Sequence, residues 1–474
     1  MTISSICKLP SSRPVREFKI HDDDKGCGLG PIDVLTAVVS AGGLTASTLY
    51  QAHMRTSSFA ASDFKTLYAS AWCFARGLDA YSIANLKQVF NHNGVVQPAV
   101  WYGHAPVYPW TTLALLAPLT ALPMIPATYV AILVTGALLA CAVAALMYYS
   151  AKYFKLELVW RIIIAVLCVS GPLLGFAMNM GNVSAAVCAL CVLAFAMREK
   201  VSKRSRVRRW MPGIALAIAV LLKPHLAVWC AFGMLLLPER AARVVVIRAA
   251  ALSGVFAVLT AAALAAFSKL GLQTLSYVSM LAAENAAGAS MSAASREPLP
   301  VVSQVVSLQS ILGFWIGSPV ARDALACLLL LVTGLLMARW TRRVDSPQGA
   351  LLAVGAWCSL GMLATYHRAH DGSLLILLLP WIVARVRRTP LAWQAWGTLA
   401  PYCAMSISVD FPTVVSWLSA LPSDSAFSFV LLRQAGLAEL LLLMILLFSV
   451  RQELPEHRVA VLEPAYKEEI RHAA

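Results

Sequence analysis

Long apolar runs recur along the whole chain and set its fold class. The clearest runs cover residues 34–49, 129–147, 162–176, 244–267, 324–337 and 430–448. A helix needs roughly 20 mostly apolar residues to cross a bilayer. Inside a bilayer the main chain must satisfy its own hydrogen bonds, which favours helices. The pattern therefore predicts an all-α polytopic membrane protein.

Charged residues are few, and they lie in short clusters between these runs. The chain is 59% hydrophobic and 13% charged, with a formal net charge of +15. The excess positive charge alone could indicate nucleic acid, but its placement between apolar runs is typical of cytoplasmic anchors. The densest cluster, Arg198 to Arg209, is predicted to be cytoplasmic, as are the tails 1–30 and 451–474. We expect no nucleic-acid partner.

The first outer segment, residues 52–127, contains an apolar run at 109–123. If this run crossed the membrane, the following cluster at Lys152 and Lys155 would lie outside, against the positive-inside rule. We therefore predict a short helix that lies on the outer face or dips partway into it.

A second parity argument concerns residues 212–238, which lie between two positive clusters and are interrupted at Lys223-Pro224. Two full spans would need about 40 residues, and proline cannot continue the helical hydrogen bonding. We predict two short half-helices that meet at this break. With these counted as two passes, the chain makes about twelve passes. Both ends are then cytoplasmic, and residues 31–450 form one membrane domain.

Three polar positions carry candidate chemistry. Asp63 follows the first span, where a carboxylate near the interface can act as a base; the alternative is a solvated aspartate or a helix N-cap. Lys223 is an ionisable residue within the membrane, next to a helix N-terminus that suits a phosphate; the alternative is snorkelling. At the turn around Asn182, amides could contact a sugar or cap helices.

A late turn gathers His367, Arg368, His370 and Asp371 within five residues. These side chains could hold a phosphate or orient a hydroxyl, or they could cap two helix ends.

Two pairs of residues have metal-like spacing, but neither pair is complete. Cys188 and Cys191 form a C-x-x-C inside an apolar run, and His367 and His370 are three residues apart. Neither pair has a further ligand at suitable spacing. We expect no metal and no cofactor.

The polar pieces occur in one order along the chain: Ser62-Asp63-Phe64 through Tyr68, Gly77 to Tyr81, Tyr108-Pro109, Gly181-Asn182, Lys223-Pro224 and the late histidine turn. Their order and membrane placement resemble glycosyltransferase family 87, the polyprenyl-phosphate-sugar-dependent group of the GT-C superfamily, over roughly residues 31–380. Trp110, Ala80 and Asn182 depart from residues common in that family, which leaves the sugar and acceptor open.

The resemblance implies a GT-C-type fold with outer-face juxtamembrane helices and with Asp63 as the catalytic base. From the residues themselves, we expect Lys223, with His367 or Arg368, to hold the donor phosphate. Further substrate contacts are expected at Tyr68, Tyr81, Tyr108, Asn182, His370 and Asp371.

The implied reaction moves a sugar, with inversion, from a polyprenyl-phosphate donor to an envelope lipid or glycan on the outer face of the inner membrane. Mannose is the commonest association of the family, and arabinose or another sugar remains open. A transporter or lipid flippase is the competing class. Its usual matched pair of broken helices has no evident counterpart in this sequence. An inert partner in envelope assembly is the second alternative.

Overall fold

The computed structural model describes residues 30–54, 61–95, 107–199, 206–288, 305–365, 367–405, 430 and 433–455. These residues form helices, apart from turns and one pair of two-residue strands. The helices of the first half are α1 (Pro31–Met54), α2 (Ser62–Ala75), α3 (Ile83–His92), α4 (Trp110–Leu116), η2 (Ala117–Ala121), α5 (Met124–Phe154), α6 (Leu158–Ser170), α7 (Pro172–Asn179), α8 (Ser184–Ala196), α9 (Arg206–Leu222) and α10 (Pro224–Leu236).

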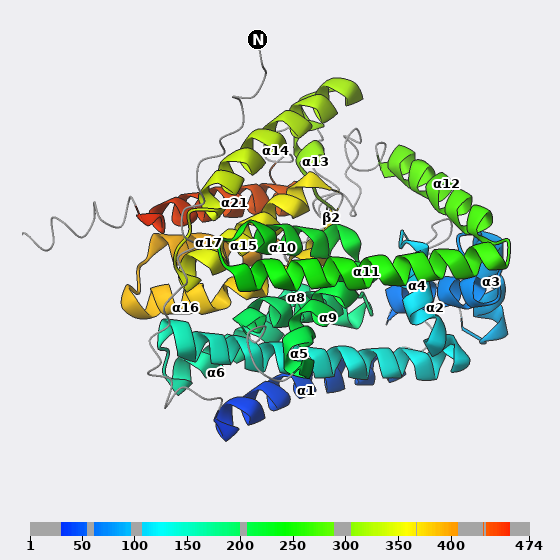
Figure 1. Cartoon of the computed structure of the whole chain (residues 1–474), viewed down its shortest axis with the longest axis horizontal. Helices are drawn as coiled ribbons and strands as arrows, with labels where there is room; N and C mark the ends of the chain where they lie inside the picture. Colours follow the sequence, from blue (N-terminus) through cyan, green and yellow to red (C-terminus); the bar gives the residue numbers. More distant parts are fainter. Residues whose placement is uncertain are drawn as a thin grey trace, which may run out of the picture.

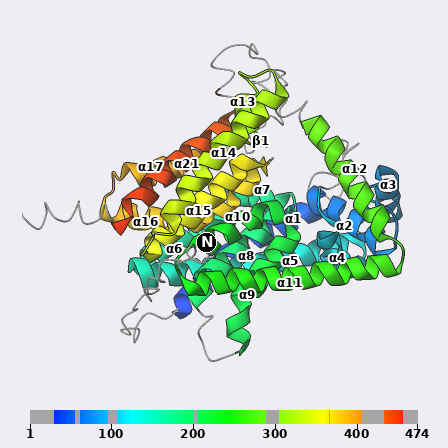
Figure 2. The same cartoon turned by 45° about the horizontal axis from the view of Figure 1, so that its top comes forward.

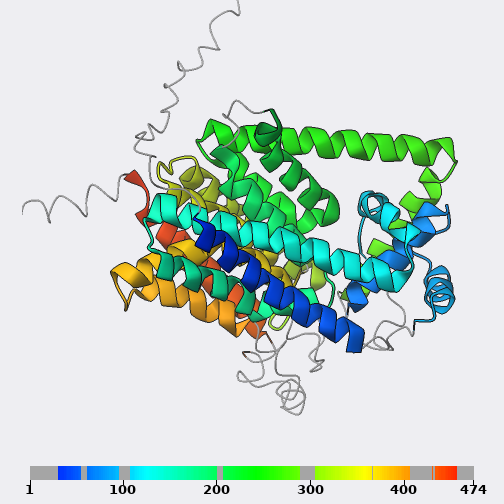
Figure 3. The same ribbon diagram turned by 90° about the horizontal axis from the view of Figure 1, so that it is seen from below.

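The second half begins with the long helix that runs along one edge of the bundle in Figure 3. Its elements are α11 (Arg240–Ala266), α12 (Leu270–Gly288), β1 (Val305–Val306), α13 (Leu308–Leu312), α14 (Pro319–Thr341), α15 (Pro347–Ala364), β2 (His367–Arg368), η6 (Ala369–Leu378), α16 (Leu379–Arg388), α17 (Trp393–Ala404) and α21 (Gln434–Gln452). Strands β1 and β2 pair antiparallel, with Val306 opposite His367.

Seven helical segments in the described part are long and apolar enough to cross a membrane. They are α1, α5, α11, α14, α15, the continuous η6–α16 segment and α21. The chain is thus an all-α polytopic membrane protein, as the hydrophobic pattern predicted. The total of about twelve passes stays a prediction, because it counts helices that are too short to cross alone.

One predicted run is bent. The apolar run at residues 162–176 is divided between α6 and α7, which meet at an angle of 47°. Pro172 is the first residue of α7. Proline has no N–H to continue the ladder of α6, so the second helix takes a new direction.

Helix α8 lies at the centre of the bundle, and α11 and α14 lie on its outside (Figures 1 and 3). Nearly every residue of α8 is buried, and it is rich in alanine and cysteine. Small side chains let neighbouring helices approach closely. In α11 and α14 most apolar side chains are exposed, as expected for surfaces in contact with lipid.

The short helices α2, α3 and α4 gather at one end of the bundle, where α12 also lies (Figures 1 and 3). The run predicted not to cross the membrane forms α4 and η2, and α9 ends at Leu222 immediately before α10 begins at Pro224. Both sequence predictions, a short helix and a helix broken at Lys223, are confirmed.

Ion pairs join helix ends at the opposite end of the bundle. Each pair links two ends that the charge pattern assigned to the same side of the membrane, including the start of α1 and the ends of α5 and α8. The pairs are Arg161–Asp33 at 2.6 Å, Lys152–Glu199 at 2.8 Å and Arg198–Glu239 at 2.6 Å. The shared side is therefore visible in the packing as well as in the sequence.

Candidate active site

The start of α2 is fastened to the turn between α7 and α8. The N–H of Ala61 donates to the carbonyl of Asn179 at 2.8 Å, and the N–H of Asp63 donates to that of Met180 at 3.0 Å. First-turn N–H groups have no partner within their own helix, and this turn supplies carbonyls for two of them. Asp63 is thereby held against the turn.

Gly181 makes this close approach feasible. Its φ is +64°, and a Cβ there would lie 2.9 Å from the Cβ of Phe64. Only glycine adopts such a conformation readily while leaving room for a neighbouring chain. The Gly181-Asn182 pair singled out in the sequence is therefore a turn that brings Asn182 to Asp63.

Asn182 connects the carboxylate of Asp63 with Ser184 and Lys223. Its Nδ2 donates to Oδ2 of Asp63 at 2.7 Å, and its Oδ1 accepts from the N–H of Ser184 at 2.9 Å. Oδ1 also lies 2.6 Å from Oγ of Ser184 and 3.5 Å from Nζ of Lys223. The amide thus presents a donor to the carboxylate and an acceptor to the ammonium.

Lys223 lies at the break between α9 and α10, and its side chain is buried. Nζ bonds Oδ1 of Asp371 at 2.6 Å and Oγ of Ser184 at 2.7 Å. The hydroxyl of Thr112 on α4 donates to the carbonyl of Leu221 at 2.7 Å, which satisfies a main-chain acceptor that the break leaves without a helical donor. Helix α4 therefore helps to fix the break.

Asp371 and His370 come from η6, after the second strand. Both are about 3% exposed. Oδ1 of Asp371 is 2.5 Å from Oγ of Ser184, and Nε2 of His370 is 3.7 Å from Oδ1 of Asp371. The side chains of these two residues of the late turn are therefore buried in the bundle.

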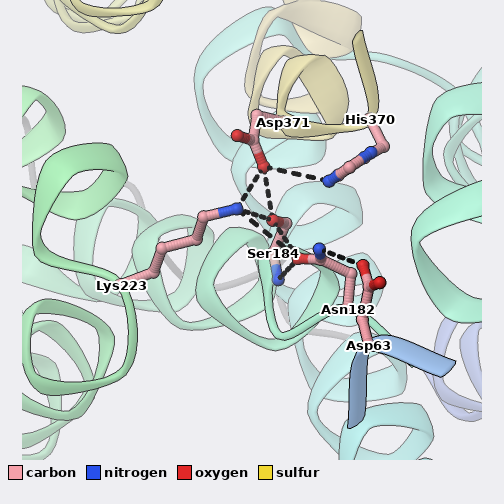
Figure 4. Close-up of polar contacts among 6 residues, drawn as sticks. All are labelled: Asp63, Asn182, Ser184, Lys223, His370 and Asp371. Atoms are coloured by element: carbon pink, nitrogen blue, oxygen red, sulfur yellow. Dashed lines mark hydrogen bonds and ion pairs between the residues drawn. The ribbon is translucent and has the colours of Figure 1, made fainter. Parts of the chain in front are cut away.

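Figure 4 shows these six side chains in one connected series, which we call the polar chain. In order they are Asp63, Asn182, Ser184, Lys223, Asp371 and His370. They belong to α2, the α7–α8 turn, the start of α8, the α9–α10 break and η6, which are far apart in sequence. Buried charges persist when they are paired and hydrogen-bonded, and here Lys223 and Asp371 supply that pairing.

The three predicted tyrosines lie in a neighbouring cluster. The hydroxyl of Tyr68 donates to the carbonyl of Leu122 at 2.6 Å, and that of Tyr81 donates to the carbonyl of Tyr108 at 2.8 Å. Burial raises the pKa of Tyr81 well above its ordinary value. The phenol therefore stays protonated and acts as a donor.

Helix α12 packs against this cluster through contacts with the residues that follow α2. Nε2 of Gln273 donates to the carbonyl of Leu78 at 2.6 Å, and the hydroxyl of Ser276 donates to Oδ2 of Asp79 at 3.0 Å. The rings of Tyr81 and Tyr277 lie 5.4 Å apart. We call α2, α3, α4 and α12, with their tyrosines, the tyrosine platform.

Sequence reasoning brought five of the six residues of the polar chain into view and missed one. Asp63, Asn182, Lys223, His370 and Asp371 meet in the polar chain, whereas the side chains of His367 and Arg368 lie outside the described residues. Ser184 was missed, although it follows Asn182 by two positions at a helix start.

Lys65 was the second residue that sequence reasoning missed. A lysine near the start of a mostly apolar helix could have drawn attention to it. It is 2% exposed, and its Nζ has no hydrogen-bond partner among the described residues. Burial lowers its pKa, because an unpaired charge away from water is costly.

An apolar cavity of about 350 Å³ adjoins the polar chain. Its walls come from α4 and η2, from one face of α5, from α8 and from α9. Phe64, Gly181 and Asn182 also line it. The volume is within the range of small-molecule sites.

The fold and these contacts frame the comparison with known families. The sequence profile of glycosyltransferase family 87 matches residues 107–365, which is more than half of the chain. The chain belongs to glycosyltransferase family 87. The matched range contains Asn182, Ser184 and Lys223, whereas Asp63 and Asp371 lie outside it. No curated protein and no solved structure matches the chain.

Membership makes this family 87 protein a membrane glycosyltransferase. The resemblance noted in the sequence is thereby confirmed at the level of the family. Among the residues that the structure describes, no three histidine, cysteine, aspartate or glutamate side chains are placed to hold a metal ion.

Proposed function

We propose that this protein transfers a sugar from a polyprenyl-phosphate donor to a hydroxyl of an envelope lipid or glycan, with inversion. Mannose is the first sugar to test, and arabinose is the second. The observation that carries the proposal is the 2.7 Å bond from Asn182 to Oδ2 of Asp63. It fixes a carboxylate at the head of the polar chain, next to an apolar cavity and in a chain of glycosyltransferase family 87.

Asp63 is the general base in this scheme. The acceptor oxygen attacks the anomeric carbon from the side opposite the phosphate, and its proton passes to Asp63. The bond from the anomeric carbon to the phosphate oxygen breaks, and its electron pair stays on the lipid monophosphate. A base positioned in this way contributes about 10²- to 10⁴-fold to the rate.

Lys223 is the described cation nearest to Asp63 along the polar chain. In the structure its ammonium is bound to Asp371 and Ser184, so contact with a phosphate requires an exchange of partners. His367 and Arg368 are the further proposed phosphate ligands. Positive charge at a developing phosphate anion is most effective in a site from which water is excluded.

The proposed setting follows from the topology. The ion-paired helix ends lie at the opposite end of the bundle from the tyrosine platform (Figure 1). Positive clusters at that end support a cytoplasmic assignment, in the inner membrane, with both termini on that side. The reaction then takes place at the outer face. The scheme requires no metal or cofactor, and its partners are the lipid donor, the acceptor and the bilayer.

The decisive test is transfer of radiolabelled sugar in proteoliposomes. Polyprenyl-phosphate mannose, arabinose and other sugars are offered with extracted envelope lipids and glycans. Wild type is compared with Asp63→Asn and with Asp323→Asn, a carboxylate-to-amide change at an exposed site on α14. Product from wild type and Asp323→Asn, but not from Asp63→Asn, supports the proposal. Folded wild type that makes no product with any donor favours the transporter alternative, which an uptake assay then tests.

A further inference from the structure

A buried threonine outside the polar chain bonds to the helix break that carries Lys223. Thr112 lies in α4 and is fully buried. Its hydroxyl donates to the carbonyl of Leu221 at 2.7 Å and lies 3.4 Å from the carbonyl of Leu222. The bond joins residues 109 positions apart in the sequence. The break is therefore held by a side chain of α4 as well as by its own two helices.

Lys223 is the joint between the two helices of the break. Its N–H donates to the carbonyl of Ala219 at 3.0 Å, and its carbonyl accepts from the N–H of Ala227 at 3.1 Å. Pro224 has no N–H with which to extend the first helix. The main chain of Lys223 takes φ −151° and ψ 80°, which lies outside the helical region. Thr112 therefore bonds the main chain at the point where helical hydrogen bonding is interrupted.

The helix of Thr112 also packs against the helix of Asp63. Leu113 of α4 and Phe64 and Leu67 of α2 belong to one buried apolar cluster. Phe64 follows Asp63 directly in the sequence. Leu113 follows Thr112 in the same way. One packed unit, α2 with α4, thus carries the proposed base and bonds the joint that carries the proposed phosphate ligand.

We propose that Thr112 is a positioning residue for the donor phosphate. The inference rests on the proposed function, in which the ammonium of Lys223 leaves Asp371 and binds the phosphate. A lysine side chain is flexible, so the place that its ammonium reaches after this exchange depends on where its main chain is held. By bonding the carbonyl of Leu221, Thr112 keeps that main chain at a fixed distance from Asp63.

A positioning role differs from a purely structural one in which ligand responds. A threonine that only satisfied a buried carbonyl would act on the stability of the fold, and its removal would weaken the binding of every ligand alike. A threonine that positions Lys223 acts through the ammonium. Its removal should therefore weaken recognition of the phosphate and leave the acceptor unaffected.

The test compares three variants in proteoliposomes. Thr112→Val removes the hydroxyl at nearly constant volume, and Thr112→Ser restores it. The matched control is Thr120→Val on η2, whose hydroxyl donates to a main-chain carbonyl of its own segment, that of Ala117 at 2.7 Å. Sugar transfer is measured alone and with two inhibitors, polyprenyl monophosphate and the uncharged polyprenol. Rates are normalised to the amount of folded protein, measured by gel filtration before reconstitution.

We expect Thr112→Val to lower kcat/KM for the donor about tenfold or more, because a displacement of about 1 Å at a reacting site can cost about 10²-fold in rate. The preference of inhibition for polyprenyl monophosphate over polyprenol should fall by a similar factor. The KM for the acceptor should stay within about twofold. Thr112→Ser and Thr120→Val should behave as wild type in every measurement.

Thr112→Val with wild-type kinetics and phosphate preference overturns the inference, as does a loss confined to the KM for the acceptor, a loss that Thr112→Ser does not restore, or an equal loss in Thr120→Val. An equal loss from Thr112→Val in a Lys223→Met background also overturns it, because independent effects multiply. If Thr112→Val does not fold, Thr112→Cys, with its weaker donor, takes its place. These outcomes leave the proposed function standing, whereas that function fails if folded wild type transfers no sugar from any donor.

Discussion

The polar chain and the tyrosine platform are both buried, but their polar groups make different bonds. In the platform, the hydroxyls of Tyr68 and Tyr81 donate to main-chain carbonyls. In the polar chain, side chains bond chiefly to other side chains, and charged groups are among them (Figure 4). Bonds to the main chain hold a segment in place, whereas paired side-chain charges can exchange partners when a substrate arrives. We therefore infer that the platform holds the site in place and that the polar chain carries the proposed chemistry.

The two regions also share one helix. Asp63 lies in the first turn of α2, and Tyr68 follows later in the same helix. Figure 2 shows the platform helices lying side by side at one end of the bundle. The platform helices thus hold the helix that carries this carboxylate, and the proposed base needs such support from its surroundings.

The largest expected effect comes from Asp63→Asn. Removal of the base should lower kcat by about 10²- to 10⁴-fold, whereas thermal unfolding in detergent should change little, because the amide can still accept from Asn182. A radiolabel transfer assay and a melting curve on the same preparation test this. Retention of more than a tenth of the activity would remove Asp63 from the role of base.

Lys223→Met should lower kcat by about 10²- to 10³-fold and also destabilise the fold. It leaves the buried carboxylate of Asp371 without its cation, and breaking a buried pair costs about 3–5 kcal/mol. The double variant Lys223→Met with Asp371→Leu should recover most of the stability but none of the activity. A double variant that regains activity would show the pair to be purely structural.

Asn182→Leu tests the link between the two charged ends of the polar chain. Loss of a hydrogen bond to a charged group is worth roughly 1.5–3 kcal/mol, which corresponds to about a ten- to a hundredfold lower kcat. The KM for the donor should stay within about twofold, since the amide contacts the base. An equal loss in Tyr68→Phe would mean that the contrast between the two regions is wrong.

Tyr81→Phe should have a small effect on stability and almost none on kcat. The change removes one hydrogen bond to a carbonyl, worth about 1 kcal/mol. Melting temperature and kcat are compared with those of Tyr50→Phe, whose ring is exposed on α1. A tenfold loss of kcat at unchanged stability would place this tyrosine at the substrate.

Lys65→Met should give the smallest change, a slightly higher melting temperature near neutral pH. Burial lowers the pKa of Lys65 in the folded protein, so the unfolded chain binds the proton more readily. Stability of the wild type then rises as pH increases from the lowered pKa towards the ordinary value of about 10.5. Melting curves of both proteins between pH 7 and 10 should converge, and curves that diverge would contradict the assignment.

Much of the fold could be predicted because the bilayer imposes strong local rules. Apolar runs predicted the spans, and the proline after Lys223 predicted the break in the helix. The bend between α6 and α7 was not expected, although Gly171 and Pro172 mark it. A run of uniform hydropathy does not show where one helix ends and another begins.

The candidate site was predicted in part. Asp63, Lys223 and Asp371 each stand out as charges within or next to apolar runs, and such charges are rare without a function or a partner. Ser184 does not stand out, because a serine at a helix start is an ordinary cap. Only its three short contacts, to Asn182, Lys223 and Asp371, reveal its place.

The sequence by itself determined the membrane fold, the side shared by the positive helix ends and the residues able to carry charge chemistry. Local hydropathy and charge suffice for these, because each helix meets the bilayer on its own. Tertiary structure alone decided that Lys223 pairs with Asp371, that Asn182 binds Asp63 and that an apolar cavity ends beside them. Those contacts join residues separated by up to 148 positions, and such partners are chosen by packing among helices, which no local pattern records.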